Sequence, residues 1–198
     1  PWSHGGWHRG DGDCLGAVRF HQNTSAWYRR EVELPWLNHH LKDGPAPDLA
    51  AATVFETGTN QWRRYTTWPP EKSAPCTLYL GEKGVLQFEP PGDGAVQAFD
   101  EWVSDPAKPV PFIPNIAMGM TREHMVDDQR FAASRPDVVV YVTPPLEEDL
   151  TVAGPLRANL WVSTSGTDSD WVVKLIDVYH GDYPNPEPNP LNLRMGGY

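Results

Sequence analysis

Residues 154–163 read Gly-Pro-Leu-Arg-Ala-Asn-Leu-Trp-Val-Ser, and this stretch decides the fold class. From Leu156 to Ser163, the apolar side chains of Leu, Ala, Leu and Val alternate with Arg, Asn, Trp and Ser. Successive side chains of a β-strand point to opposite faces, so the alternation predicts a strand with one buried face. A helix would instead repeat its apolar residues every three or four positions.

Other short apolar or alternating runs extend this pattern along the chain. They cover residues 52–56, 61–67, 77–80, 85–89, 138–142 and 170–179. Glycines, prolines and two long proline-rich connections, 105–116 and 181–191, separate the runs. Parallel strands would need helices between them. The pattern therefore predicts a mainly β fold, a jelly-roll β-sandwich, over residues 45–198.

The first 44 residues have a different character. Residues 1–20 contain many glycines, which disfavour a regular helix, so a loop is predicted there. A helix is predicted over 23–42, because Asn23 or Thr24 can cap it and apolar residues return at helical spacing. Pro35 should kink or split this helix, because proline lacks a backbone donor and crowds the preceding turn. A linker rich in glycine and proline follows.

Charge and hydropathy exclude two classes of partner. The 198 residues carry 26 acidic and 16 basic side chains, a formal net charge of −10. This charge would repel the phosphates of nucleic acids and the headgroups of anionic membranes. No run approaches the 18 or so apolar residues that a membrane helix needs. The two cysteines, Cys14 and Cys76, could form one bridge, but they have neither metal-site nor redox-motif spacing.

The chemistry of the chain is concentrated in residues 1–7, Pro-Trp-Ser-His-Gly-Gly-Trp. His4 lies between aromatic and glycine residues in the predicted loop. Imidazole titrates near neutrality, and the glycines after it allow close approach to another backbone, so His4 can serve as a general base. The alternative is a histidine packed among aromatic rings with its N–H satisfied.

These seven residues, with the glycine-rich stretch and the helix that follow them, resemble the α-amino-acid ester hydrolases. Relatives in the same superfamily include glutaryl cephalosporin acylases, cocaine esterase and X-Pro dipeptidyl peptidases. The resemblance continues in order along nearly the whole chain, through Val54–Arg63, Asp128-Gln129-Arg130, Ser134-Arg135-Pro136-Asp137, Asp149–Pro155 and Asp168-Ser169-Asp170-Trp171.

The resemblance implies a serine hydrolase in which residues 1–44 end an α/β-hydrolase domain and residues 45–198 form a jelly roll, cut short at its C-terminal end. His4 matches the histidine of a Ser-Asp-His triad. The chain holds no Gly-x-Ser-x-Gly elbow, so the serine and the aspartate are expected in an upstream domain, and this piece alone should be inactive. The substrate would be an ester or amide of a small acyl group, without a cofactor. Such enzymes are often exported, which favours a periplasmic or secreted location.

Trp2 and Trp7 flank His4, so we expect them to line the acyl pocket. No metal site is expected. Glycines separate His4 from His8 and prevent the helix that would align them for zinc. The acidic pairs Asp11-Gly12-Asp13 and Asp127-Asp128 do not complete a calcium loop. Asp128-Gln129-Arg130 is predicted to be structural, with Arg130 fixing a loop through a carboxylate.

A different class of function stays open at this point. Jelly rolls with exposed tryptophans often bind carbohydrate, so the chain could be a binding module without activity. The helix and the histidine loop count against that alternative, because a free-standing module has no need of them. The sandwich could also cap an active site and help to assemble homo-oligomers, which is compatible with the enzyme.

Overall fold

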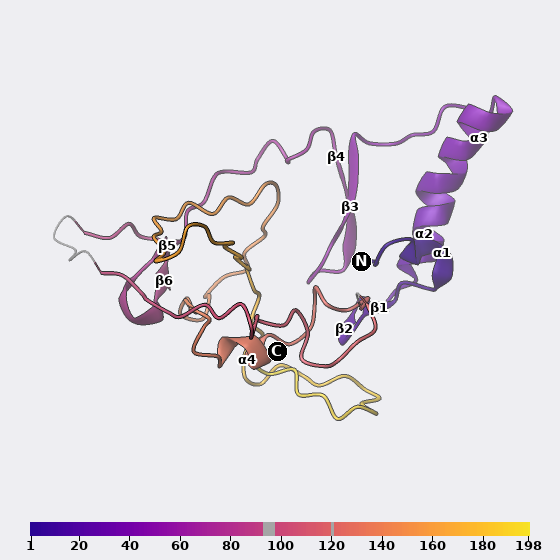
Figure 1. Cartoon of the computed structure of the whole chain (residues 1–198). Helices are drawn as coiled ribbons and strands as arrows, with labels where there is room; N and C mark the ends of the chain where they lie inside the picture. The colour runs from indigo at the N-terminus through magenta and orange to yellow at the C-terminus, as the bar shows by residue number, and fades with distance from the viewer. Residues whose placement is uncertain (93–97, 120) are drawn as a thin grey trace.

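The computed structural model describes residues 1–92, 98–119 and 121–198. A helical column stands at one side, a hairpin lies beside it, and mostly irregular chain fills the rest (Figure 1). The elements are α1 (Gly6–Arg9), β1 (Cys14–Leu15), β2 (Val18–Arg19), α2 (Thr24–Tyr28), η1 (Arg29–Glu33), α3 (Leu34–Lys42), β3 (Ala52–Glu56), β4 (Gln61–Tyr65), β5 (Tyr79–Leu80), η2 (Glu82–Gly84), β6 (Leu86–Gln87) and α4 (Arg130–Ala133).

The helical column consists of α2, η1 and α3, and it covers the predicted range. Asn23 caps its start, since its Oδ1 accepts a hydrogen bond from the Ala26 N–H at 2.7 Å. At the other end Asp43 adopts a left-handed conformation, with φ of 52°. The Gly44 N–H then donates to the Asn38 carbonyl at 3.0 Å, which satisfies one of the last carbonyls of the helix.

Pro35 was expected to kink or split the helix, but α2, η1 and α3 follow one another without a break, with one altered turn. Pro35 is the second residue of α3, so its missing N–H falls inside the column. The turn before it, η1, is a π turn, in which the Leu34 N–H bonds to the Arg29 carbonyl five residues back. Proline crowds the carbonyl four residues before it, and widening the turn relieves such crowding. The column therefore holds one wide turn and continues as a helix.

Three antiparallel hairpins, β1–β2, β3–β4 and β5–β6, form three separate two-stranded sheets. The β3–β4 hairpin is the most regular, and Phe55 pairs with Trp62 one position from its turn end. The prediction of a strand over 52–56 is confirmed. Three other predicted strands are shorter in the structure: 61–67 contracts to β4, 77–80 to β5 and 85–89 to β6.

The strands predicted over 138–142, 154–163 and 170–179 are not formed, apart from one parallel bridge between Val85 and Val142. A strand needs a continuous ladder of hydrogen bonds to a neighbour, and among the described residues only isolated backbone bonds, at Val142 and Tyr179, link these segments to other chain. The expected buried face is not covered either, since Leu156 is 69% exposed. The mainly non-helical character is confirmed, whereas the described residues build no two-sheet sandwich. The jelly roll therefore stays a prediction.

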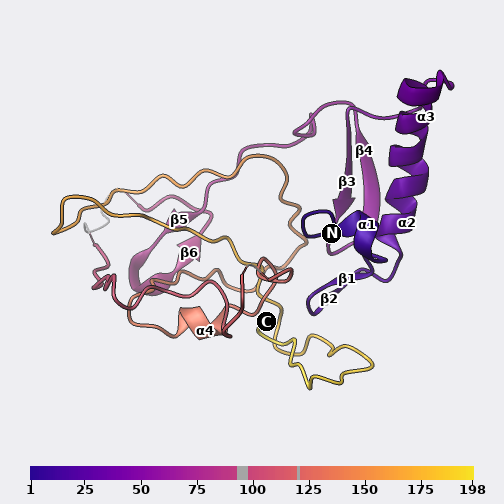
Figure 2. The same cartoon turned by 45° about the vertical axis from the view of Figure 1, so that its right-hand side comes forward.

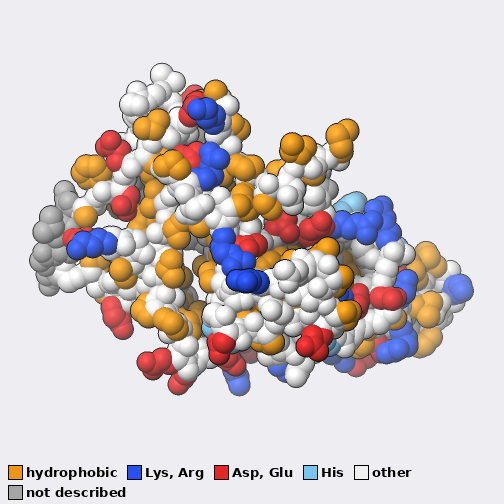
Figure 3. Space-filling model, turned by 90° about the horizontal axis from the view of Figure 1, so that it is seen from below, with side chains coloured by type: hydrophobic (Ala, Val, Ile, Leu, Met, Phe, Trp, Pro, Cys, Tyr) orange, Lys and Arg blue, Asp and Glu red, His pale blue; other side chains and the backbone are white. Residues whose placement is uncertain are grey.

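Much of the apolar surface of this chain is uncovered. The accessible surface is 15970 Å² for 22.2 kDa, whereas a compact monomer of that mass exposes about 9,400 Å². On the face seen in Figure 3, hydrophobic side chains are exposed in many patches among polar and charged ones. Within the described residues, the buried apolar side chains are those of Phe20, Ile113, Ala132 and Met195.

Candidate functional site

His4 lies in a tight turn at the base of the helical column. The Gly6 N–H donates to the Ser3 carbonyl at 2.8 Å, and Gly5 has a φ of 66°, a conformation that glycine adopts without strain. The imidazole of His4 is exposed, and within the described residues its ring forms no hydrogen bond.

The loop predicted over residues 1–20 contains a helical turn, α1, and two short strands. Gly6 begins α1 in spite of its low helix propensity, because the Ser3–Gly6 turn has already fixed the backbone. The helix starts after His4, so His4 and His8 are not on one helical face. The described residues contain no group of three or more His, Cys, Asp or Glu side chains placed to hold a metal ion.

Trp2 and Trp7 pack against the column. The Trp2 ring centroid lies 5.1 Å from that of Tyr28, 5.9 Å from Trp7 and 6.0 Å from Trp62. Trp7 lies 6.0 Å from Tyr28. Within this chain both rings belong to an aromatic cluster that attaches the His4 turn to the helix. Trp2 also borders a small hollow of about 190 Å³, which His4 does not line.

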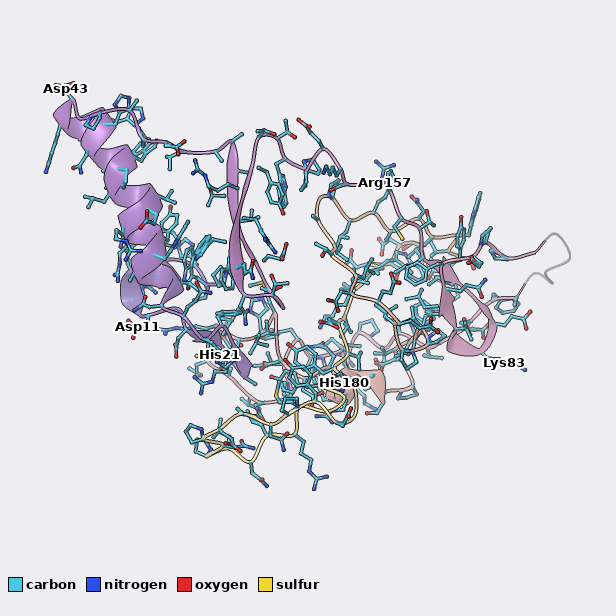
Figure 4. All side chains as sticks on the ribbon, turned by 180° about the vertical axis from the view of Figure 1, so that it is seen from behind. Asp11, His21, Asp43, Lys83, Arg157 and His180 are labelled. Atoms are coloured by element: carbon cyan, nitrogen blue, oxygen red, sulfur yellow. The ribbon has the colours of Figure 1, made fainter. Side chains whose placement is uncertain are left out.

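A buried hydrogen-bond relay holds Trp2 in place. Its Nε1–H donates to Thr24 Oγ1 at 2.9 Å, and the Thr24 hydroxyl donates to the Gly12 carbonyl at 2.6 Å. Thr24 is fully buried at the start of α2. The Ser25 N–H donates to the Asp11 carbonyl at 3.0 Å, which ties the same loop to the helix. Figure 4 shows Asp11 at this end of the column.

Glu33 contacts the residues that follow His4. Its Oε1 accepts a hydrogen bond from Trp7 Nε1–H at 3.3 Å and lies 3.3 Å from His8 Nε2. The Glu33 side chain is 25% exposed, whereas that of His8 is 57% exposed. Glu33, Tyr28 and Trp62 were not among the site residues predicted from the sequence. The aromatic residues of the predicted helix were the one available signal.

The β3–β4 hairpin packs against the same aromatic cluster. Trp27 of α2 stacks on Trp62 of β4, and Phe55 meets Trp62 edge to face at 5.3 Å. The Gln22 side chain donates to the Asn60 carbonyl at 2.5 Å. The turned view of Figure 2 agrees with Figure 1 in placing the N-terminus next to α1 and the hairpin.

The structural role predicted for Asp128-Gln129-Arg130 is confirmed. Arg130 donates to Asp128 Oδ2 at 2.7 Å and to the carbonyls of Arg194 and Gly196 at 3.2 and 3.1 Å. Burial acts to raise the pKa of Asp128, but the hydrogen bonds from Arg130 outweigh it and leave that pKa lowered. Arg130 thereby holds the end of the chain against α4.

Both cysteines are free thiols: Cys14 is half-buried and Cys76 is exposed, and burial raises the pKa of Cys14. The pairing that the sequence left open is not formed. Asp11, one of the weighed calcium ligands, accepts a hydrogen bond from Asn23 Nδ2 at 2.9 Å. Among the described residues, no helix is long and apolar enough to cross a membrane.

Comparison with known proteins places these features in a family context. A family profile described as the X-Pro dipeptidyl-peptidase C-terminal non-catalytic domain matches residues 47–192. Cocaine esterase from Rhodococcus sp. (strain MB1 Bresler) is 32% identical over 153 residues, covering 73% of this chain and 26% of the esterase. The crystal structure of an aminopeptidase from a marine sediment archaeon, Thaumarchaeota archaeon, matches with a TM-score of 0.66 and 47% identity over 75% of this chain and 24% of that one. The chain thus spans about a quarter of the length of these relatives.

Proposed function

Since the chain belongs to the family of X-Pro dipeptidyl-peptidase C-terminal non-catalytic domains, we propose that it is the C-terminal part of a serine hydrolase. In this proposal residues 45–198 form the non-catalytic domain, completed as a jelly roll. Residues 1–44 end an α/β-hydrolase domain and contribute His4 to its triad. The uncovered apolar surface supports a large contact with other polypeptide, which would include the domain that carries the serine and the aspartate.

The main support for the proposal is that the His4 side chain is exposed and free of hydrogen bonds within the described residues. Its ring is exposed and unbonded within the described residues, while the turn around it is held by the Gly6–Ser3 hydrogen bond and by the packing of Trp2 and Trp7. A general base needs a rigid backbone and a free acceptor nitrogen directed at its partner. A histidine packed among the rings would lack the second property.

His4 would take the proton of the serine hydroxyl as the oxygen attacks the acyl carbonyl, and a tetrahedral intermediate would form. It would then give that proton to the departing alcohol or amine, leaving an acyl-enzyme that water hydrolyses by the same steps in reverse roles. No cofactor takes part in this scheme.

The substrate is proposed as an ester or amide of a small acyl group, of the α-amino-acid or β-lactam side-chain type. The two relatives support this breadth, because one is named an esterase and the other an aminopeptidase. Ester and peptide cleavage differ in the leaving group but share the acyl-enzyme. Trp2 and Trp7 are retained as residues that would border the acyl group from behind His4.

Substitution of His4 in the full-length protein tests the proposal. His4→Ala should lower kcat by about 10⁴- to 10⁶-fold, because triad residues act as a unit. His180→Ala is the matched control, since His180 is also exposed but lies beside α4, away from the column (Figure 4). Normal turnover of p-nitrophenyl esters and aminoacyl anilides by His4→Ala would refute the assignment, provided that an active-site serine reagent still abolishes activity. Saturable binding of glycans without hydrolysis would favour the binding module instead.

A further inference from the structure

Glu33 joins the His4 turn to the helical column through a single carboxylate oxygen. Glu33 Oε1 receives the Trp7 indole N–H and faces the His8 imidazole, each at 3.3 Å. Trp7 and His8 both belong to α1, which begins two residues after His4. The Gly6 N–H to Ser3 carbonyl bond then links α1 directly to the turn that carries His4. A displacement of α1 would therefore move His4.

The π turn is what brings Glu33 to this place. In a regular α-helix, five residues advance by about 500°, which would put Glu33 about 140° around the helix from Tyr28. In η1 the Leu34 N–H reaches the Arg29 carbonyl, five residues away. Residues five apart then lie nearly above one another, as residues four apart do in an α-helix. Tyr28 and Glu33 consequently meet the same neighbour, Trp7.

Arg30 and Glu31, which are also in η1, pair with each other and take no part in the contact between Glu33 and α1. Arg30 pairs with Glu31 at 2.5 Å, and both side chains are largely exposed. Arg29, Arg30 and Glu33 border a shallow hollow on the helix surface. The Trp7 bond is better shielded than the His8 contact, because His8 is more than half exposed. The hydrogen bond from the Trp7 indole to the Glu33 carboxylate is thus the anchor.

We propose that Glu33 is a positioning residue for His4: it fixes α1 on the column and thereby holds the imidazole at the place where the upstream serine meets it. This inference rests on the proposed function. Glu33 does not touch the reacting atoms, so its removal should misplace the base and lower kcat more than it changes KM. Misplacement of a catalytic group by about 1 Å can cost about 100-fold in rate.

Kinetics of the full-length protein with a p-nitrophenyl ester test the inference. Glu33→Ala should lower kcat by about 10- to 100-fold while KM changes less than about twofold. Glu33→Gln keeps an acceptor oxygen for Trp7 and should restore most of the loss. Glu31→Gln, on the same turn, is the matched control and should behave like the unaltered enzyme. Equal kcat for Glu33→Ala and the unaltered enzyme would overturn the inference.

A double-mutant cycle with Trp7→Phe separates positioning from general loss of structure. The phenyl ring keeps the aromatic packing but lacks the indole N–H, so Trp7→Phe should reproduce much of the Glu33→Ala defect. The double variant should then be little worse than either single one. Fully additive losses in kcat would contradict the inference. If Glu33→Ala fails to fold, Trp7→Phe alone provides the test, and an unchanged kcat in that variant would contradict the inference. If the Glu33 variants keep normal kcat while His4→Ala is inactive, the positioning role of Glu33 is refuted and the proposed function stands. If His4→Ala is active, both the proposed function and the positioning role are refuted.

Discussion

The indole rings of Trp27 and Trp62 are stacked, with 4.1 Å between their centroids and 11° between their planes. Trp27 belongs to the helical column and Trp62 to the β3–β4 hairpin, so this pair joins the first 44 residues to the chain that follows them. Trp62 also contacts Trp2 and Phe55. Trp62 is thus one of the residues through which the hairpin supports the loop that carries His4.

Truncation of Trp62 should therefore destabilise this region. We expect Trp62→Ala to lower the free energy of unfolding by about 3 kcal/mol, the usual scale for removing a packed tryptophan. Trp161→Ala should cost less than about 0.5 kcal/mol, because the Trp161 side chain is fully exposed. Urea unfolding of the full-length protein, followed by circular dichroism, measures both. Similar losses for the two variants would contradict the central place assigned to Trp62.

Gly12 is predicted to be intolerant of a side chain. Its φ is 63°, and a Cβ there would overlap Thr24 Oγ1 and Trp2 Nε1, the two groups of the buried relay. Gly12→Ala should cost about 3 kcal/mol, from the left-handed backbone together with the overlap. Gly10→Ala provides the comparison, because Gly10 is extended and a Cβ there meets open space. Thermal melts that rank the two glycines equally would refute the relay.

The ion pair of the β3–β4 hairpin should make stability depend on pH. The hydrogen bond from Arg63, aided by Thr59, lowers the pKa of Glu56. A carboxyl with a lowered folded pKa contributes stability above its unfolded pKa of about 4.3, and that contribution disappears as pH falls through the folded value. Arg63→Gln should thus be less stable than the unaltered protein at pH 6, and the difference should close below about pH 4.

The control for this pH effect is Arg157→Gln, since Arg157 is exposed and forms no ion pair with the described residues. Its difference from the unaltered protein should not vary with pH between 6 and 3. Urea midpoints at several pH values supply the measurement. A constant gap for Arg63→Gln across the same range would show that Glu56 gains nothing from its partner.

The sequence pattern was sufficient to predict those elements whose structure depends on residues close to one another along the chain. The helix over 23–42 follows from the Asn23 cap and the apolar spacing, and β3–β4 follows from two apolar runs around a short turn at Gly58. The pattern at 154–163 states which side chains share a face but not which strand lies beside them. Without a neighbour among the described residues, that segment forms no strand.

The same distinction between local and long-range information applies to the candidate site. His4 is identified by its own local motif, and its exposure agrees with the assigned role without testing it. Glu33 escapes detection because its contact depends on a turn with an additional residue, which helical periodicity does not anticipate. The packing of Trp2 involves Trp62, which lies 60 residues further along the chain and was assigned only to a strand.

The π turn also sets how the column tolerates changes in length. Because η1 spans five residues where an α turn spans four, removal of Arg30 could close it to an ordinary turn. Tyr28 and Glu33 would then stand four apart and still share a face, so both ends of the column would keep their orientation. An extra residue inserted into α3 has no wide turn to absorb it and would rotate everything beyond it by about 100°. Single-residue gaps among related proteins should accordingly gather at this turn and avoid the helix on its C-terminal side.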